Sequence, residues 1–392
     1  MFEELQKYQN HLISQILNVP FNEAINIYIE NFEFLRDYYF IFPHSEGTNY
    51  MQKFRDLALD QIDIIHFFSS ETLYCLNAQS FISEMMHGNY QIKIASHLSL
   101  DTQIQSYLYR NYVNEKNKIP NNIADIQKLI ESRLCLIDCL AYTFENALFN
   151  TEFTKTQIYK DNAYAFERYF FKSKVKAKLY SSKLLKLDRK LFNNEFANYY
   201  RRQYLLYYLE LLVMVDISIN KKSKTIYEKE LTMVKYFHEE IGIVSDRELN
   251  LAKLFFTHGT RLKFFGKIQK GRNDIIKNLK NMAWDIFHLQ YTLGNFIHIP
   301  ESADFIIPFF VTYDQRLKDI SPIYKLKSIA FIRNGFEKHF NFITDLIDPS
   351  IKHDYLTAKA YYERQRKLKD ATEESIIVKI ESEIEKYEKL LS

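Results

Sequence analysis

Apolar positions recur every three or four residues over most of the chain, which is the spacing of amphipathic helices. In the N-terminal part this spacing predicts helices over Phe2–Leu17, Phe21–Tyr39 and Met51–Leu76. Between them, the polar segment Phe42–Asn49 contains a proline and a glycine and predicts a turn. We therefore expect residues 1–90 to form an N-terminal helical region.

Beyond residue 90 the pattern includes strands as well as helices. The segment 92–101, IKIASHLSLD, ends in apolar–polar alternation and stops on Asp101, as a strand would. The segment Phe305–Val311 is continuously apolar and has the aromatic and branched content of a buried strand. A helix over Gln103–Tyr112 is expected after the first strand, and a helix that carries Asp285 is expected before the second.

The segment Ile123–Asn150 is strongly periodic and predicts one long helix. Asp138 and Glu145 are seven residues apart within it, so they are expected on nearly the same helix face. Cys135 and Cys139 are four residues apart on this predicted helix, and we interpret them as a structural thiol pair. Together these patterns predict an α/β fold that is mostly helical overall.

The later part of the chain predicts further helices over Lys224–Glu240 and from Ser245, where Glu248 completes a capping box. The charged tail Leu356–Ser392 carries an apolar stripe at helical spacing, which is typical of a packing or dimerising helix. The stripe consists of Ile376, Ile377, Ile380, Ile384, Tyr387 and Leu391. A homodimer through this C-terminal helical region is therefore one expectation.

Amino-acid composition excludes some classes of protein but indicates no specific function. Of the 392 residues, 47% are apolar, which excludes global disorder, and the 8 Gly and 7 Pro fit a helical chain. The net charge of +3 by itself indicates no particular partner. The three cysteines form no metal or disulfide framework, and no signal peptide is recognised, so we expect a reducing cytoplasm.

Insertion into a membrane is not expected. The most apolar segment, Tyr204–Val215, is interrupted by Glu210. It is also well short of the roughly 20 apolar residues that a membrane-spanning helix needs.

Acidic residues at the predicted strand ends are the main candidates for chemistry. Asp101 ends the first strand, and Asp314 follows the second strand after Thr312 and Tyr313. In open parallel sheets the carboxyl ends of the strands are where ligands bind. Asp285 lies on the preceding helix, one loop away. Acids brought together in this way either repel each other or share a cation.

The motifs around these acids resemble those of PIN-like ribonuclease domains. The C-terminal half of that family is similar to AWDIFHL followed by FFVTYDQRL, at residues 283–289 and 309–317. The family also has an acid in an L-D-T pattern after its first strand, which Leu100-Asp101-Thr102 matches. A later helical Glu is matched by Glu145 in YTFENAL. The resemblance covers four short islands rather than a continuous alignment.

The resemblance implies a parallel-sheet core that hydrolyses RNA with Mg²⁺ or Mn²⁺ held by Asp101, Glu145, Asp285 and Asp314. Asp101 and Asp285 would ligate the metal most directly, Glu145 would complete the shell or orient water, and Asp314 would support a second metal or the geometry of the first. Carboxylates are suitable ligands because these hard cations prefer oxygen. Asp138 remains the alternative to Glu145. Thr312 could position water or phosphate through its hydroxyl.

The domain boundaries that follow are a nuclease core over residues 91–325 and a C-terminal helical region over residues 326–392. Far more residues separate Glu145 from Asp285 than a compact PIN-like domain has there. This departure requires a long helical insertion at about residues 150–258, or it means that Glu145 is the wrong acid.

Two basic runs accompany the acids. The run at residues 171–191 has aromatic neighbours and suits either a solvated face or a surface that tracks phosphates and stacks bases. The second run precedes the helix of Asp285, and its candidate substrate-binding residues are Lys263, Lys267, Lys270 and Arg272. A basic connector on an ordinary surface is the alternative. His288, one turn after Asp285, is interpreted as structural.

Two competing hypotheses come from different classes. The segment Arg333–His339, RNGFEKH, resembles the R-N-x-x-x-x-H signature of HEPN ribonucleases. Enzymes of that family cleave RNA without metal. The resemblance implies an all-helical fold with Arg333 and His339 in the active site. Alternatively, the chain is a non-enzymatic helical interaction protein whose acids are ordinary surface groups. The leading hypothesis is a metal-dependent endoribonuclease acting on RNA, with single-stranded DNA left open as a substrate. A toxin, phage-defence or RNA-processing role would be compatible with it.

Overall fold

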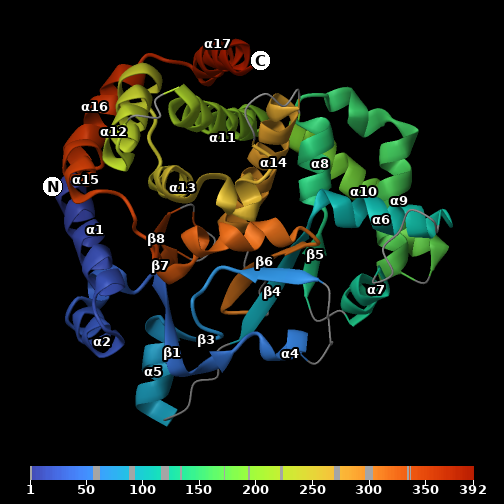
Figure 1. Cartoon of the computed structure of the whole chain (residues 1–392). Coiled ribbons are helices and arrows are strands. Elements are labelled where there is room, and N and C mark those ends of the chain that lie inside the picture. Colours follow the sequence, from blue (N-terminus) through green and yellow to red (C-terminus); the bar gives the residue numbers. More distant parts are fainter. Residues whose placement is uncertain are drawn as a thin grey trace.

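The computed structural model describes residues 2–55, 62–87, 93–115, 123–132, 135–171, 173–192, 195–220, 224–268, 274–295, 303–332, 335 and 337–392. These residues form a mixed α/β fold with two four-stranded sheets, around and above which helices pack (Figure 1). The expected α/β class with much helix is confirmed.

The first sheet contains the parallel strands and has the order β2-β6-β4-β5. Its central strands, β4 (Ile94–Leu100) and β6 (Phe305–Thr312), run parallel and pair from Ile94–Phe305 to Leu100–Val311. β5 (Leu136–Asp138) is parallel to β4, while β2 (Asp63–His66) is antiparallel to β6 on the other edge. Every residue of β6 is buried, in keeping with its continuous apolar run.

The second sheet is antiparallel and has the order β3-β1-β7-β8. It joins the two ends of the chain, because β1 (Tyr38–Asn49) pairs with β3 (Thr72–Leu76) on one side and with β7 (Leu326–Ile332) on the other. β8 (Lys338–Phe342) pairs with β7 and completes the sheet.

The helices fall into three groups by position along the chain. The first group is α1 (Phe2–Asn18), α2 (Phe21–Glu30), α3 (Phe32–Leu35), α4 (Gln52–Arg55), α5 (Ala78–His87), α6 (Thr102–Tyr112), α7 (Ile123–Ser132) and α8 (Leu140–Ala147). The middle group is α9 (Gln157–Phe170), α10 (Lys174–Phe192), α11 (Glu195–Asn220), α12 (Ile226–Tyr236), α13 (Asp246–His258) and α14 (Ile275–Gly294). The last group is α15 (Pro349–Tyr355), α16 (Ala358–Leu368) and α17 (Glu373–Leu391).

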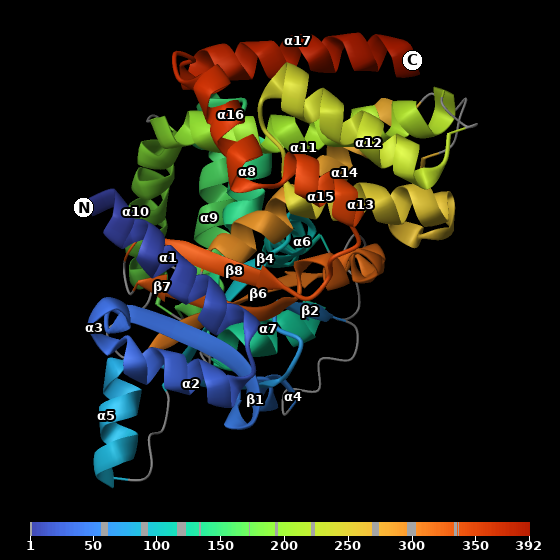
Figure 2. The same ribbon diagram turned by 90° about the vertical axis from the view of Figure 1, so that its left-hand side faces the viewer.

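Helix α14 links the parallel strands to the helical part of the molecule. It contacts β6 on one side and α11 on another, and α17 in turn packs on α11. In both views α17 lies at one end of the molecule and α5 at the other, with the strands nearer α5 (Figures 1 and 2). A side chain on α14 can therefore face either the strands or the helical part.

The expectation of an entirely helical N-terminal region is wrong. β1 includes the whole predicted turn Phe42–Asn49, and β2 and β3 lie within the predicted helix Met51–Leu76. The run Tyr38–Ile41 is apolar at every position and Phe40 and Ile41 are both fully buried, which is the pattern of a strand covered on its two faces. Helix α1 agrees with the prediction, whereas α2 ends at Glu30, and Tyr38 and Tyr39 at the end of the predicted helix belong to β1.

The single helix expected over Ile123–Asn150 is also wrong. The chain forms α7, then β5, then α8, so Asp138 ends a strand while Glu145 lies on the following helix. The Asp138 carboxylate accepts a hydrogen bond from the backbone N–H of Leu140 at 2.8 Å, which favours a turn at this point over a continuous helix. Cys135 and Cys139 flank the strand rather than share a helix.

The C-terminal region is helical only after residue 348, because β7 and β8 precede α15. The stripe on α17 is buried within the same chain: Ile380 is 0% exposed and α17 packs against α11. The stripe is therefore a packing surface, and a dimer through it stays a prediction. Among the described residues, no helix is long and apolar enough to cross a membrane.

Candidate active site

Asp101 lies at the carboxyl end of the central parallel strand β4. Its backbone N–H donates to the carbonyl of Val311 at 2.9 Å, which continues the pairing of β4 with β6 by one residue. Its carboxylate accepts a hydrogen bond from the Thr312 hydroxyl at 2.6 Å. Burial raises the pKa of Asp101, and the charge of Glu145 adds to this, although Thr312 and the nearby His288 act to lower it.

Asp314 lies two residues beyond the end of β6 and is tied to the same hydroxyl. Its backbone N–H donates to the Thr312 oxygen at 2.9 Å, so Thr312 connects Asp101 and Asp314. Its carboxylate accepts from the backbone N–H of Arg316 at 2.9 Å and from the guanidinium of the same residue, with Nε at 2.8 and 3.0 Å from the two oxygens. Burial opposes ionisation of Asp314, but Arg316 and the charge of Lys267 hold its pKa below the ordinary value.

Asp285 approaches this strand edge from α14. Burial raises its pKa well above the ordinary range, and the charges of Asp101, Asp314 and Glu145 raise it further, opposed by Arg316. The residue as a whole is half-buried. A like-charge cluster of this kind favours a proton or a cation at its centre.

Glu145 reaches the cluster from α8, and its side chain is 36% exposed. Its carboxylate lies 3.7 Å from Nε2 of His288, one turn after Asp285 on α14. His288 is 2% exposed and stacks between Trp284 and Phe310, at ring-centroid distances of 5.6 and 6.2 Å. Burial acts to raise the pKa of Glu145, but His288 brings it below the ordinary value.

The structure thus brings Asp101, Glu145, Asp285 and Asp314 together at the carboxyl end of β4 and β6, where their charges interact. Among the described residues, no three His, Cys, Asp or Glu side chains are arranged so that they could hold a metal ion. The contacts above give a physical reason, because Asp314 is turned to Arg316 and Glu145 to His288. A shared cation would require at least one of these two carboxylates to turn inward.

Asp138, the alternative to Glu145, has other partners at the end of β5. Its carboxylate lies 2.7 Å from Nε2 of His97 and accepts a hydrogen bond from the Ser99 hydroxyl at 3.1 Å. The predicted shared helix face with Glu145 does not exist. Asp138 orders the β4–β5 edge and the start of α8, whereas Glu145 faces His288 and the other acids.

The predicted cationic residues are only partly placed. Lys267 is exposed and close enough to lower the pKa of Asp314, and Lys263 is exposed on the short helical turn Lys263–Phe265 that contacts Gln315–Asp319. Lys270 and Arg272 lie outside the described residues. The first basic run forms α10, whose described lysines are all exposed, while its one acid, Asp188, is buried and accepts a hydrogen bond from Tyr159 at 2.6 Å.

The HEPN-like segment does not have the expected helical setting. His339 lies on β8, where it is paired with Ala330 of β7, and its Nε2 is 2.9 Å from a carboxylate oxygen of Glu337. Arg333 lies outside the described residues. The fold around the segment is a pair of antiparallel strands.

Two residues near the acids were not predicted to belong to the site. Arg316 forms the ion pair with Asp314, and His288, interpreted there as structural, contacts Glu145 as well as packing in the core. An arginine two residues after a strand-end aspartate was the available signal for the first. Comparisons with protein-family models, with curated proteins and with solved structures found no match.

Proposed function

We propose that the chain is a metal-dependent ribonuclease whose active centre is the cluster of Asp101, Glu145, Asp285 and Asp314. The observation that carries the proposal is the environment of Asp285. Its carboxylate is placed among three others, so that its pKa is raised well above the ordinary range by burial and by their charge. Such strongly perturbed groups gather at functional sites more often than elsewhere.

The chemistry of the four side chains suits a hard divalent cation, which would require Asp314 or Glu145 to turn inward. All four side chains offer carboxylate oxygens, which Mg²⁺ and Mn²⁺ prefer, and positive charge at the centre would relieve the repulsion on Asp285. Asp101 and Asp285 would hold the ion, and Glu145 would complete the set. When bound, such an ion supplies a nucleophilic water and neutralises charge at the leaving oxygen of a phosphodiester.

The remaining groups bind and orient the substrate. Thr312 fixes Asp101 through its hydroxyl and fixes the chain at Asp314 through its oxygen. Arg316 carries a planar guanidinium suited to a phosphate, and in its present position it neutralises Asp314. Lys267 is exposed beside it and adds positive charge that attracts a polyanion.

Cleavage of a labelled single-stranded RNA by the purified chain tests this function. We expect activity with Mg²⁺ or Mn²⁺, its loss in EDTA, and a decrease of about a hundredfold or more in Asp101→Asn and Asp285→Asn. Glu152→Gln is the matched control, because Glu152 is an exposed acid on the short turn Thr151–Lys155 and forms a surface ion pair with Lys155.

The same assay separates the alternatives. Cleavage that persists in EDTA and in both Asn variants, but disappears in His339→Ala, would replace the proposal with metal-independent chemistry. If no variant and no metal changes RNA cleavage, the chain is not a nuclease of either kind. A parallel assay with single-stranded DNA determines whether the ribose hydroxyl is required.

A further inference from the structure

A large open cavity lies on the helical side of α14, away from the acid cluster. Its volume is about 1220 Å³, somewhat above the roughly 300–1,000 Å³ of ordinary small-molecule sites. The lining side chains come mainly from α11 and α14, with contributions from α10, α13, β8 and the start of α17.

The wall of the cavity formed by α11 and α14 is a continuous group of aromatic rings. Tyr199 and Tyr200 of α11 have ring centroids 5.4 Å apart, and Tyr200 lies 5.9 Å from Tyr291 of α14. Phe287 stacks on Tyr291 at 6.4 Å with an interplanar angle of 12°. Tyr199 is 47% exposed, and the guanidinium of Arg202 lies over its ring at 5.5 Å from the centroid. Planar rings of this kind stack well on planar ligands.

Polar and cationic groups line the same cavity. Gln203 and Gln290 are both half-buried. The amide nitrogen of Gln290 donates to Glu248 at 2.9 Å, which leaves its carbonyl oxygen to accept from a ligand. Arg247 lies over the Phe342 ring at 4.8 Å, and its Nε has no hydrogen-bond partner among the described residues.

Lys338 provides the second cation of the cavity. Its Nζ donates to the carbonyl of Gly294 at 2.6 Å and lies 5.9 Å from the centre of the Phe340 ring. Burial lowers the pKa of Lys338 to about 8. The two acids at the start of α17, Glu373 and Glu374, also line the cavity, and Glu373 is paired with Arg202 at 2.8 Å, which offsets its negative charge.

We infer that this cavity binds a nucleotide, with its base stacked on the aromatic wall of α11 and α14 and its phosphate held by Lys338 and Arg247. Aromatic faces, side-chain amides and cations together match a base, its hydrogen-bonding edge and a phosphate. The ligand is either a free nucleotide or one nucleotide of an RNA strand, which share this chemistry.

The cavity and the acid cluster are separate sites on one helix. Phe287, Gln290 and Tyr291 are two, five and six residues after Asp285, which places them on roughly the opposite side of α14. The inference therefore does not rest on the proposed nuclease activity, and it can fail without affecting that activity.

Calorimetric titration of the full chain in EDTA tests the inference. The probes are the four common ribonucleoside monophosphates, the corresponding nucleosides and a short single-stranded RNA. We expect binding of at least one phosphate-bearing probe, weakened about tenfold by Tyr199→Ala or by Lys338→Gln. Tyr361→Ala is the matched control, because Tyr361 on α16 is similarly exposed (51%) and does not line the cavity.

The outcomes separate the two ligand sources and the two proposals. Binding of a free monophosphate identifies a free nucleotide, whereas binding of RNA alone, with the same dependence on the variants, identifies a strand. Because the titration is made in EDTA and reports binding alone, its result is independent of metal-dependent cleavage at the acid cluster. Affinity for phosphate-bearing probes should also fall as the pH rises through about 8, where Lys338 loses its charge, while affinity for nucleosides should not. The inference is overturned if no probe binds, or if neither Tyr199→Ala nor Lys338→Gln weakens binding.

Discussion

At the scale of single residues, the acid cluster combines two kinds of carboxylate. Asp314 and Glu145 each have a cationic or imidazole neighbour, and their pKa values lie below the ordinary range. Asp101 and Asp285 have raised pKa values because burial and neighbouring charge disfavour their ionised forms. Ionisation of the second pair at neutral pH therefore opposes folding unless a cation binds.

Asp285→Asn is expected to stabilise the chain in the absence of metal. The amide is neutral without having to bind a proton, so the melting temperature at neutral pH should rise by roughly 1–3 °C. Because the pKa of Asp285 is raised in the folded state, its unfavourable effect is present above the ordinary pKa of an aspartate and absent below it. The difference between variant and wild type should therefore vanish in acid.

Thermal unfolding in EDTA from acidic to neutral pH measures this effect, with Glu152→Gln as a surface control. Addition of Mg²⁺ should stabilise the wild type and have much less effect on the Asn variant, because binding to the folded state raises stability by mass action. A lower melting temperature for Asp285→Asn at neutral pH would contradict the electrostatic account.

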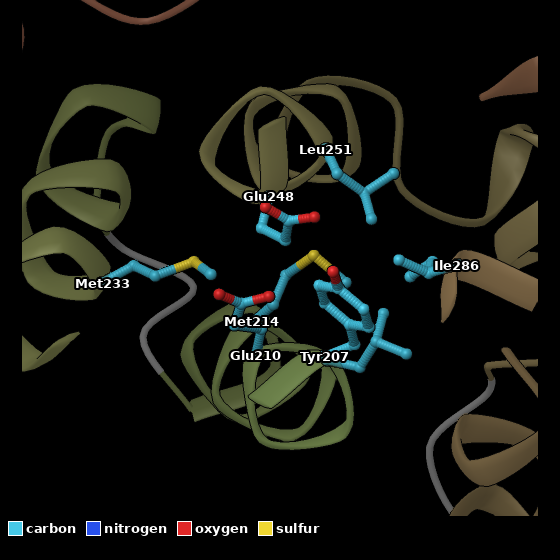
Figure 3. Close-up of a pocket in the computed structure, with 8 residues that line it drawn as sticks. Tyr207, Glu210, Met214, Met233, Glu248, Leu251 and Ile286 are labelled. Carbon is cyan, nitrogen blue, oxygen red and sulfur yellow. The ribbon is translucent and has the colours of Figure 1, made fainter. Parts of the chain in front are cut away.

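A second buried acid lies on the helical side of the molecule. Glu210 of α11 and Glu248 of α13 point toward one another beside a cavity of about 10 Å³, near the lower limit for one water molecule (Figure 3). Glu248 accepts hydrogen bonds from Ser245 and Gln290, whereas one oxygen of Glu210 has no partner among the described residues. Burial, and then the charge of Glu248, raise the pKa of Glu210 well above the ordinary range, although Arg247 opposes this.

Glu210→Gln should remove a pH dependence of stability. With a raised folded-state pKa, Glu210 keeps its proton to higher pH in the folded chain than in the unfolded chain. Wild-type stability should therefore decrease as the pH rises above the ordinary glutamate pKa, and the free energy of unfolding of the Gln variant should decrease less over the same interval. Urea unfolding at several pH values measures both curves. Parallel curves would show that Glu210 does not titrate as the structure implies.

At the scale of elements, the sequence predicted what local pattern determines. β4, β6 and α14 lie close to their expected positions, because a buried strand and an amphipathic helix each have a recognisable period. The placing of Asp101, Asp285 and Asp314 at one strand edge follows from these elements. β1, β2 and β3 were missed because their partners are distant in sequence: Tyr39 pairs with Phe331, and Ile64 pairs with Val311.

Only those features of the site that follow from local sequence pattern could be predicted. An acid at a strand end is visible in the sequence, but the rotamer that turns Asp314 to Arg316 is not. The contact between Glu145 and His288 depends on how α8 packs against α14, which no local pattern encodes. The aromatic cavity likewise combines elements from α10 to α17 and was not predicted.

Helix α17 gives the clearest test at this scale. Ile380 is fully buried against the rest of the chain, so Ile380→Ala should lower the free energy of unfolding by about 2–5 kcal/mol. Val378, on the same helix, is 58% exposed, and Val378→Ala should change it by less than about 0.5 kcal/mol. The oligomeric state, measured by light scattering, should be the same for both variants. A change of oligomeric state in Ile380→Ala alone would show that the stripe is an interface between copies.

At the scale of the whole molecule, the two ends of the chain are joined by strands. In the second sheet β1 pairs with β7, and in the first sheet β2 is the edge strand that pairs with β6. Phe67 and Phe68, which follow β2, are fully buried in the main core together with Phe310 of β6. The segments outside residues 91–325 thus supply both sheet pairing and core side chains to the part that carries the acids.

A fragment of residues 91–325 should therefore not fold by itself. It lacks every strand of the second sheet, and it leaves the outer side of β6 unpaired, with the face of α11 that packs on α17 exposed. We expect far-UV circular dichroism to show residual helix, but thermal unfolding to be gradual rather than cooperative. Co-expression of residues 1–90 with residues 91–392 is the control, since this pair contains all the strands and should restore a cooperative transition. Cooperative unfolding of the 91–325 fragment alone would contradict this prediction. It would mean that residues 91–325 form an independent core, for which neither β2 nor the second sheet is needed.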